Sequence, residues 1–309
     1  YKLTLYQFNL EMKFLITGGT GLIGKNIVQL LIRNNHHINI LSRKKKDNSE
    51  NLSFFKWNPK RQTVDYDSIN DVDIVINLAG ENIFGLWTSS KKERILKSRL
   101  QSLQLLKKLI KHRPNKVKQI ISASAIGIFP NSQEAVYNED SDLKGKTFLA
   151  NVVKQWEKEI ESFKEFRIPI TTIRIGMVFS ELGGIIKVLR FILNSRILFL
   201  VGNGNQKISW IHIEDLSEIF YKLSLKNYNG LIHAVNNNPT TMLDLLKKLS
   251  DNYSFCFKIF TPNIILKSLF KVFFMKDFYD DIVNSSKNVV SMEMKKISHK
   301  FKYTELNDL

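Results

Sequence analysis

Residues 14–24 read FLITGGTGLIG, an apolar run followed by glycines at 18, 21 and 24 and then by apolar residues at helical spacing. Gly18 permits a tight turn after a strand, Gly21 lets the backbone approach a pyrophosphate, and Gly24 lets the next helix pack close to the sheet. The N-terminus of that helix offers N–H donors to an anion. The stretch therefore predicts a dinucleotide-binding turn at the start of a βαβ unit, with a purely structural glycine turn as the alternative.

The alternation of short apolar runs with helical patterns continues to about residue 175, which is typical of parallel βαβ units. The predicted strands are Phe14–Thr17, Ile38–Ser42, Ser53–Trp57, Ile74–Leu78, Gln119–Ser124 and Pro169–Arg174. The predicted helices are Leu22–Asn34, Lys91–Lys111 and Phe148–Phe166. Beyond Gly183 we expect helix Ile185–Asn194, strand Lys207–Ile211, helix Asp215–Leu225, strand Leu231–Val235 and helix Met242–Leu249.

These elements predict an α/β fold with a Rossmann-like doubly wound parallel sheet and a smaller C-terminal α+β lobe. The nucleotide-binding domain is expected to span residues 12–180, with some later segments returning to it, and the mixed lobe 181–309.

The second predicted strand ends in Ser42-Arg43-Lys44, about twenty residues past the glycines. A carboxylate at this place would accept a hydrogen bond from the ribose 2′-OH of NAD, whereas a guanidinium and a hydroxyl suit the 2′-phosphate of NADP. The sequence therefore favours NADP(H) as the cofactor, with Ser42 and Arg43 as its ligands. A merely solvated basic turn is the alternative, because the whole chain is basic.

Lys and Arg number 46 against 29 Asp and Glu, a formal net charge of +17. The basic residues are scattered through almost every predicted helix and no nucleic-acid motif accompanies them, so we expect no nucleic-acid partner. Lys or Asn interrupts the longest apolar stretches before they could cross a bilayer, and no membrane span is expected. The sequence assigns no oligomeric state.

The lone cysteine, Cys256, excludes an internal disulfide and a cysteine-only metal site, and it is expected in the core. No metal site is predicted. The first eleven residues carry no secretory signal, and Met12 is a candidate natural start. A cytoplasmic location is expected, with an organellar stroma or matrix as the alternative if a targeting segment was removed.

Several stretches together resemble the extended short-chain dehydrogenase/reductase superfamily. They are TGGTGLIG (17–24), IVINLAG (74–80), ISASAIGIF (121–129), TTIRIGMVF (171–179) and SWIHIEDL (209–216). Others narrow the likeness to its atypical branch, the YfcH-type "epimerase family" of NAD(P)-dependent epimerase/dehydratase-like proteins with their own C-terminal domain. These are NLAGENI (77–83), Trp87, KSRLQSLQLL (97–106), KQWEKE (154–159), SSKNVVSMEM (285–294) and FKYTEL (301–306). The resemblance covers nearly all of residues 12–309.

The resemblance implies a set of cofactor contacts. Leu78 and Ala79 would line the adenosine and ribose side, Arg99 would reach the phosphates, and Val178 would pack near the nicotinamide. Residues 122–124 would border the nicotinamide ribose. With the motif positions included, the expected cofactor-binding residues are Thr17, Gly18, Gly21, Leu22, Ile23, Gly24, Ser42, Arg43, Leu78, Ala79, Gly80, Arg99, Ser122 and Val178. From the sequence alone, Arg99 would instead be a solvated charge on an exposed helix.

Catalysis in the superfamily relies on a Tyr-x-x-x-Lys pair, because a phenol must be made acidic by a nearby ammonium. Here Phe148 stands at the tyrosine position and Val152 at the lysine position. Neither side chain can move a proton. Lys154 lies two residues further on, about 200° around the helix, and is not a simple substitute.

Two weaker catalytic candidates remain. Ser124 occupies the hydroxyl position at the end of the fifth strand and could polarise a carbonyl, although an ordinary hydrogen-bonding role is the alternative. Glu81 follows the fourth strand at the carboxyl edge of the sheet and could act as acid or base if partly buried. Tyr137 is the nearest phenol, but its acidic neighbours would raise its pKa, and His212 is expected to tie the lobe to the sheet.

Three functions compete, of which the third, binding of the basic surface to nucleic acid or an anionic membrane, ranks last. The first is an NADP(H)-dependent epimerase or oxidoreductase acting on a nucleotide-sugar-like or other small carbonyl compound, with Arg174 and His212 near its cleft. The second is a non-catalytic NADPH-binding sensor or scaffold, for example one related to division, which the missing dyad favours. The sequence does not identify the substrate.

Overall fold

The computed structural model describes residues 11–44, 46–112, 114–251, 257–272 and 275–308. Cys256 lies outside this part of the chain. A central eight-stranded sheet has the strand order β13-β8-β6-β5-β1-β2-β3-β4. Every neighbouring pair is parallel except β3 and β4. The expected doubly wound parallel sheet is therefore confirmed.

The sheet strands are β1 (Lys13–Thr17), β2 (His37–Ser42), β3 (Leu52–Asn58), β4 (Thr63–Val64), β5 (Ile74–Asn77), β6 (Gln119–Ala125), β8 (Ile170–Ile175) and β13 (Gly230–Ala234). Strand β1 is hydrogen-bonded to β2 on one side and β5 on the other, so the winding reverses between β1 and β5. Ligands of open α/β sheets bind at the carboxyl ends of the strands at such a reversal.

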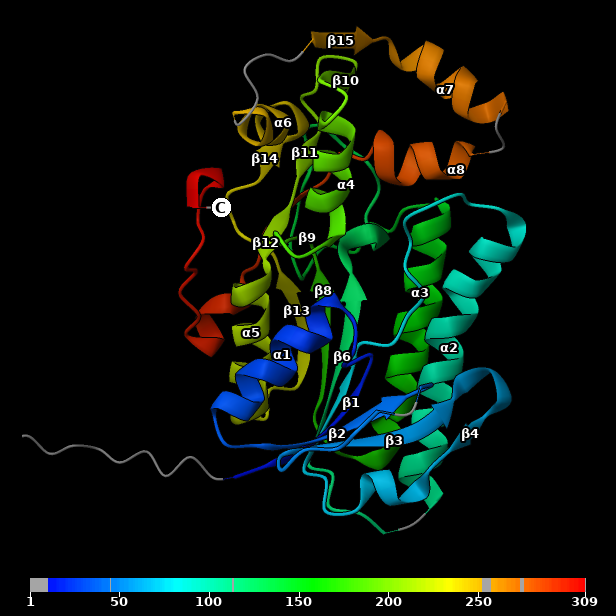
Figure 1. Cartoon of the computed structure of the whole chain (residues 1–309), viewed down its shortest axis with the longest axis vertical. Helices are drawn as coiled ribbons and strands as arrows, with labels where there is room; N and C mark the ends of the chain where they lie inside the picture. The colour runs from blue at the N-terminus through cyan, green and yellow to red at the C-terminus, as the bar shows by residue number, and fades with distance from the viewer. Residues whose placement is uncertain (1–10, 45, 113, 252–256, 273–274, 309) are drawn as a thin grey trace, which may run out of the picture.

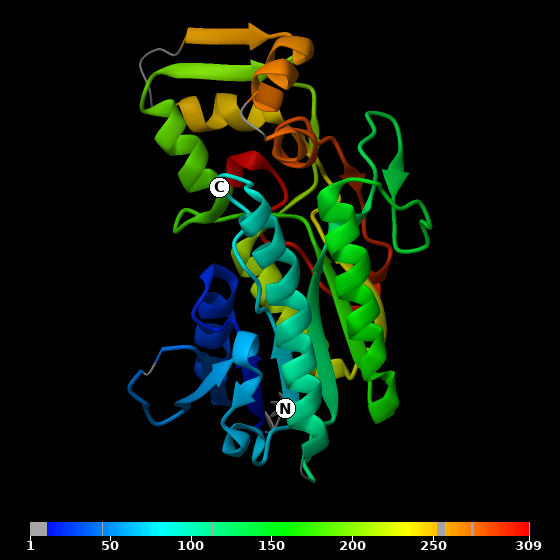
Figure 2. The same cartoon turned by 90° about the vertical axis from the view of Figure 1, so that its right-hand side faces the viewer.

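Helices cover both faces of the sheet (Figures 1 and 2). Helices α1 (Leu22–Arg33) and α5 (Ile213–Lys226) pack together on one face, and α2 (Ser89–His112) and α3 (Phe148–Glu161) on the other. The apolar residues of β1, β5 and β6 are buried between the two layers because parallel strands covered on both sides need apolar residues on both faces. This packing holds the strand ends in place.

The upper lobe consists of helices and two-stranded sheets beyond the carboxyl ends of the main strands (Figure 1). The paired strands are β9 (Met177–Phe179) with β12 (Trp210–His212), β11 (Lys207–Ile208) with β14 (Thr240–Thr241), β10 (Ile197–Val201) with β15 (Phe257–Thr261), and β7 (Val136–Tyr137) with β16 (Asn288–Val289). The helices are α4 (Gly184–Leu193), α6 (Met242–Ser250), α7 (Asn263–Val272) and α8 (Lys276–Phe278).

Two expected elements differ in the structure. The strand expected at 207–211 is two strands, because Ser209 separates a segment paired antiparallel with β14 from one paired parallel with β9. The Ser209 hydroxyl donates to Lys287 O and accepts from Val289 N–H at this point. The helix expected to reach Phe166 ends as an α-helix at Glu161 and continues as a 3₁₀ turn, Ser162–Phe166.

Candidate functional site

The glycine turn is pressed against the end of β5. Gly18 has φ +71°, and a Cβ there would lie 2.7 Å from Leu78 O. A Cβ on Gly24 would lie 2.3 Å from Gly18 O, so only glycine fits at either place. Gly21 N–H donates to Gly18 O at 2.9 Å and closes the turn. The turn therefore sits at the reversal between β1 and β5.

Helix α1 begins directly after this turn without a side-chain cap. Its N-cap is Gly21, and its first turn contains no acidic residue. Leu22 and Ile23, in that first turn, are half-buried. Uncapped N–H groups at a helix N-terminus attract anions. A hollow of about 450 Å³ beside the helix start is lined by Leu22, Lys25, Asn26, Gln29, Leu182 and Gly183.

A buried hydrogen-bond network lies beneath the turn. The Thr17 hydroxyl donates to Asn77 Oδ1 at 2.7 Å, and Asn77 Nδ2 donates to Ser122 Oγ at 3.0 Å. The N–H groups of Leu78 and Ala79 donate to Thr17 Oγ1, each at 3.2 Å. Thr17, Asn77 and Ser122 are fully buried. The network fixes the ends of β1, β5 and β6 and uses the Thr17 and Ser122 hydroxyls internally.

Arg99 lies against the backbone that follows β5. Its Nη1 donates to Ile95 O at 2.8 Å and to Glu81 O at 3.3 Å, and its Cζ lies 4.9 Å from the centre of the Trp156 ring. A Cβ on Gly80 would come within 3.2 Å of Cζ. Burial lowers the pKa of Arg99 to about 10. Arg99 is therefore not a solvated charge on an exposed helix, as its sequence position alone suggested.

Glu81 forms an ion-pair cluster with the start of α2. Its carboxylate lies 2.9 Å from Lys91 Nζ and 3.6 Å from Arg94 Nε, and its N–H donates to Ser98 Oγ at 2.9 Å. The hydrogen bond from Lys91 lowers the pKa of Glu81. A carboxyl group with a lowered pKa is a weaker proton acceptor near neutral pH. Glu81 thus fastens the loop after β5 to α2.

Strand β2 ends at Ser42, and Arg43 follows it at the carboxyl edge of the sheet. Ser42 is buried, and its hydroxyl oxygen accepts from Lys44 N–H at 3.2 Å. Arg43 is exposed and forms no ion pair with an acidic residue in the described part of the chain.

The positions of the missing dyad are apolar and packed. Phe148 contacts Trp87 edge-on, with ring centroids 5.1 Å apart, and Val152 is buried in the same cluster. Lys154 points elsewhere, because its Nζ donates to Gly145 O at 2.7 Å. Burial raises the pKa of Tyr137, so the expected direction is right, but the expected cause is wrong because the acidic neighbours do not contribute. These side chains provide no proton-transfer pair.

A polar chain occupies the neighbouring space between the sheet and α3. Ser124 Oγ donates to Glu157 Oε1 at 2.6 Å, and Arg174 grips both Glu157 oxygens through Nε and Nη2, each at 2.8 Å. The register places Ser124 opposite Arg174, whose guanidinium lies 5.3 Å from the Phe129 ring. Glu157 was not predicted as a site residue from the sequence. It follows Val153 by four residues, so a carboxylate inside an apolar helical stripe was the available signal.

We expect Glu157→Met to destabilise the fold by about 3 kcal/mol, because it leaves the Arg174 guanidinium buried without its partner. Glu157→Met/Arg174→Met should regain most of that loss, since no charge is then left unpaired. Urea unfolding of the three proteins measures both values. Lys97→Met, which breaks an exposed pair with Glu93, is the control and should cost at most about 0.5 kcal/mol. Equal stability of the single and double variants would contradict this reading.

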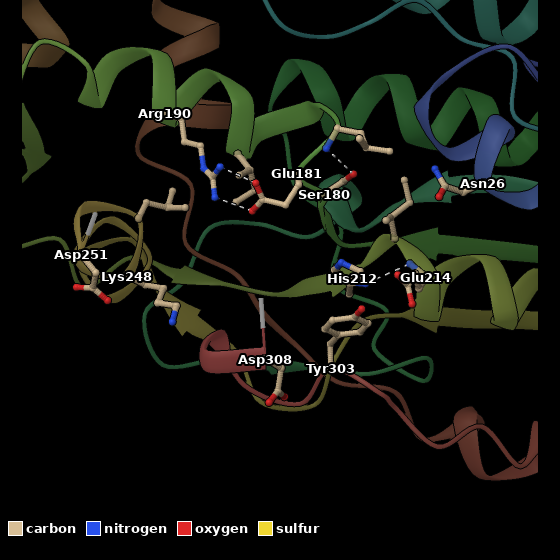
Figure 3. Close-up of a pocket in the computed structure, with 14 residues that line it drawn as sticks. Asn26, Ser180, Glu181, Arg190, His212, Glu214, Lys248, Asp251, Tyr303 and Asp308 are labelled. Carbon is tan, nitrogen blue, oxygen red and sulfur yellow. Dashed lines mark hydrogen bonds and ion pairs between the residues drawn. The ribbon is translucent and has the colours of Figure 1, made fainter. Parts of the chain in front are cut away.

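A larger cavity adjoins the hollow beside the start of α1, since Asn26 and Leu182 line both. It encloses about 490 Å³ between α1, α4, α6, the start of α5 and the C-terminal segment (Figure 3). Arg190 and Glu181 pair across its upper side (Figure 3). His212 Nδ1 accepts from Glu214 N–H, and its ring lies 3.5 Å from the Tyr303 ring, centroid to centroid. His212 therefore caps α5 and fastens the C-terminal segment, and burial lowers its pKa.

In the part of the chain that the structure describes, no helix is both long and apolar enough to span a membrane. No group of three or more His, Cys, Asp or Glu side chains there is arranged to hold a metal ion.

Comparison with known proteins places the chain in a family. A sequence model described as the NAD dependent epimerase/dehydratase family matches residues 14–236. The Epimerase family protein YfhF of Bacillus subtilis (strain 168) is 32% identical over 244 residues, which cover 77% of this chain and 79% of YfhF. An Epimerase family protein of Staphylococcus epidermidis (strain ATCC 12228 / FDA PCI 1200) is 34% identical over 220 residues, which cover 71% of this chain and 73% of that protein.

Solved structures share the fold. The human epimerase family protein SDR39U1 (isoform 2), solved with NADPH, superposes with a TM-score of 0.77 at 24% identity and covers 96% of this chain and 97% of that one. A nucleoside-diphosphate sugar epimerase from Corynebacterium glutamicum superposes with a TM-score of 0.73 at 26% identity, and the match covers 96% of this chain and 57% of that one.

Proposed function

Because the chain belongs to the NAD-dependent epimerase/dehydratase family, whose members bind a nicotinamide cofactor, we propose that it binds NADP(H) and exchanges hydride with a small substrate. The substrate class we propose is a nucleotide-sugar-like or other small carbonyl compound. One observation carries the proposal: a glycine turn that tolerates no Cβ leads into an uncapped helix N-terminus at the sheet reversal.

The residues at this edge suit each part of the cofactor. N–H groups of the first turn of α1 would hold the pyrophosphate, because they have no capping side chain. Ser42 and Arg43 would bind the 2′-phosphate, and the backbone of residues 78–80 would line the ribose. Val178 would pack beside the nicotinamide. The human structure with NADPH is like this chain in fold alone, so the choice of NADP(H) over NAD(H) rests on the basic end of β2.

When bound, the nicotinamide supplies hydride transfer to or from a substrate carbon. Among the residues of the chain, we assign the hydroxyl proton of the substrate to Ser124 as its hydrogen-bond acceptor. The hydroxyl hydrogen of Ser124 is committed to Glu157, so its oxygen can accept a hydrogen bond from a substrate hydroxyl. Arg174 holds both Glu157 oxygens, so this chain of hydrogen bonds would fix the substrate hydroxyl in one orientation for hydride transfer.

A substrate panel tests the proposal. Sugar nucleotides and small carbonyl compounds are incubated with NADPH or NADP⁺, and oxidation, reduction and epimerised product are followed by absorbance and chromatography. Ser124→Ala should lower turnover of any active compound by about a hundredfold or more, while NADPH binding stays unchanged. Ser195→Ala, at an exposed serine remote in sequence from this cluster, should leave turnover unchanged.

Tight NADPH binding with no turnover of any compound would contradict the catalytic part and favour the sensor. Undiminished turnover in Ser124→Ala would contradict the assignment of the proton to Ser124.

A further inference from the structure

Strand β15 and helix α7 form the outer end of the upper lobe, where the two views of Figures 1 and 2 agree in placing them. Helix α7 contains no buried residue. Its large apolar side chains stand in solvent: Ile264 is 75% exposed, Ile265 57%, Leu269 50% and Val272 71%. A helix of a globular protein normally buries such side chains, so this surface has no covering partner among the residues that the structure describes.

The exposed apolar residues form a stripe. At about 100° per residue, Ile265, Leu269 and Val272 fall within about 60° of one another around α7. Phe260 in β15 adds an apolar side chain that is 55% exposed. Phe270 lies on another side of the helix and contacts Tyr279, with ring centroids 5.3 Å apart. The helix is thus fixed to the lobe by one side and presents another to the outside.

The charged residues of β15 and α7 are all lysines, and the acidic residue that follows in α8, Asp277, is paired with Lys92. The sequence from 257 to 276 contains four lysines and no acidic residue. Lys267 and Lys271 are exposed on α7, one turn apart and away from the apolar stripe. The whole chain carries a formal net charge of +17. A basic, apolar helix on the surface is suited to the headgroup boundary of an anionic bilayer, where lysines meet phosphates and apolar residues enter the acyl region.

We propose that α7 and β15 dock the protein peripherally on an anionic lipid membrane, with α7 lying in the plane of the interface. A helix of 10 residues cannot span the hydrocarbon core, so this contact is a surface contact. The apolar stripe inserts into the acyl region, and the lysines make the binding selective for anionic lipid. This inference does not depend on the cofactor or on catalysis.

Vesicle sedimentation of the intact chain tests the proposal. Vesicles of phosphatidylcholine alone are compared with equimolar phosphatidylcholine and phosphatidylserine, at low and at high salt. The protein should sediment with the anionic vesicles and much less with the neutral ones. Ile265→Ser/Leu269→Ser and Lys267→Glu/Lys271→Glu should each weaken the partition by about tenfold or more.

The controls match these variants in type and exposure. Leu225→Ser replaces a leucine of α5 that is 51% exposed, and Lys108→Glu reverses an exposed lysine of α2. Neither should change the partition, and all variants should retain NADPH binding if the wild type has it. Equal sedimentation with neutral vesicles, or no effect of the α7 substitutions, would overturn the proposal. So would a dimer in gel filtration that the α7 substitutions split while no vesicle binds.

Discussion

Arg43→Glu is expected to weaken NADPH binding by about a hundredfold while changing NADH binding by less than about threefold. The 2′-phosphate is the only group that distinguishes the two cofactors, and Arg43, with the exposed Lys44 beside it, is the guanidinium at the end of β2. Replacing it removes an attractive charge and adds a repulsive one beside the phosphate. The loss of affinity is therefore expected for NADPH and not for NADH.

Fluorescence titrations of both nucleotides with the wild type and the variant measure this selectivity. Arg61→Glu, which reverses another exposed arginine beyond β3, is the matched control and should leave both affinities unchanged. An equal loss of NADPH and NADH in Arg43→Glu would refute the assignment of the 2′-phosphate to this residue. The basic turn would then be a solvated surface feature.

Gly24→Ala is expected to destabilise the fold by about 3 kcal/mol and to abolish cofactor binding. The added Cβ would lie 2.3 Å from Gly18 O and 2.6 Å from Gly19 Cα. Both neighbours are backbone atoms, so no side chain can move to relieve the contact. The turn and the start of α1 must shift together. Thermal and urea unfolding, followed by NADPH titration at a temperature where the variant is folded, measure the two effects.

Two further glycine variants separate stability from binding. Gly127→Ala places its Cβ at an ordinary contact distance of 3.7 Å from Leu149 and should leave stability and NADPH binding unchanged. Gly21→Ala places its Cβ 3.3 Å from Gly18 O on the exposed side of the turn. It should lower NADPH affinity with little effect on folding, because the methyl group occupies the approach to the pyrophosphate. NADPH binding by Gly24→Ala at wild-type affinity would contradict the role given to the turn.

The fold followed closely from the sequence because two independent signals agreed along most of it. Apolar strands such as Ile74–Asn77 are buried on both sides, and helices such as α1 repeat apolar residues at helical spacing. Short strands that depend on a distant partner were less predictable. The division at Ser209 arises from pairing with strands more than thirty residues away, and β7 pairs with a strand more than 150 residues away. Local periodicity encodes neither pairing.

The site was predicted unevenly for a related reason. The steric role of Gly18 and Gly24 can be read from their spacing after a strand, and the geometry of the turn agrees with it. The partners of Ser124 cannot be predicted from the sequence, because Glu157 lies in α3 and Arg174 in β8 and the fold alone brings them together. Arg99 shows the same difficulty, since its helix position suggests exposure while Trp156 and the backbone near Gly80 enclose it.

The central claim is that the glycine turn and the end of β2 together bind a phosphorylated adenine dinucleotide. Calorimetric titration of the unaltered chain with NADPH, and separately with NADH, tests it most directly. We predict one NADPH bound per chain, at least about tenfold more tightly than NADH, which corresponds to about 1.4 kcal/mol. No heat of binding from NADPH with a correctly folded chain, or a preference for NADH, would contradict the account.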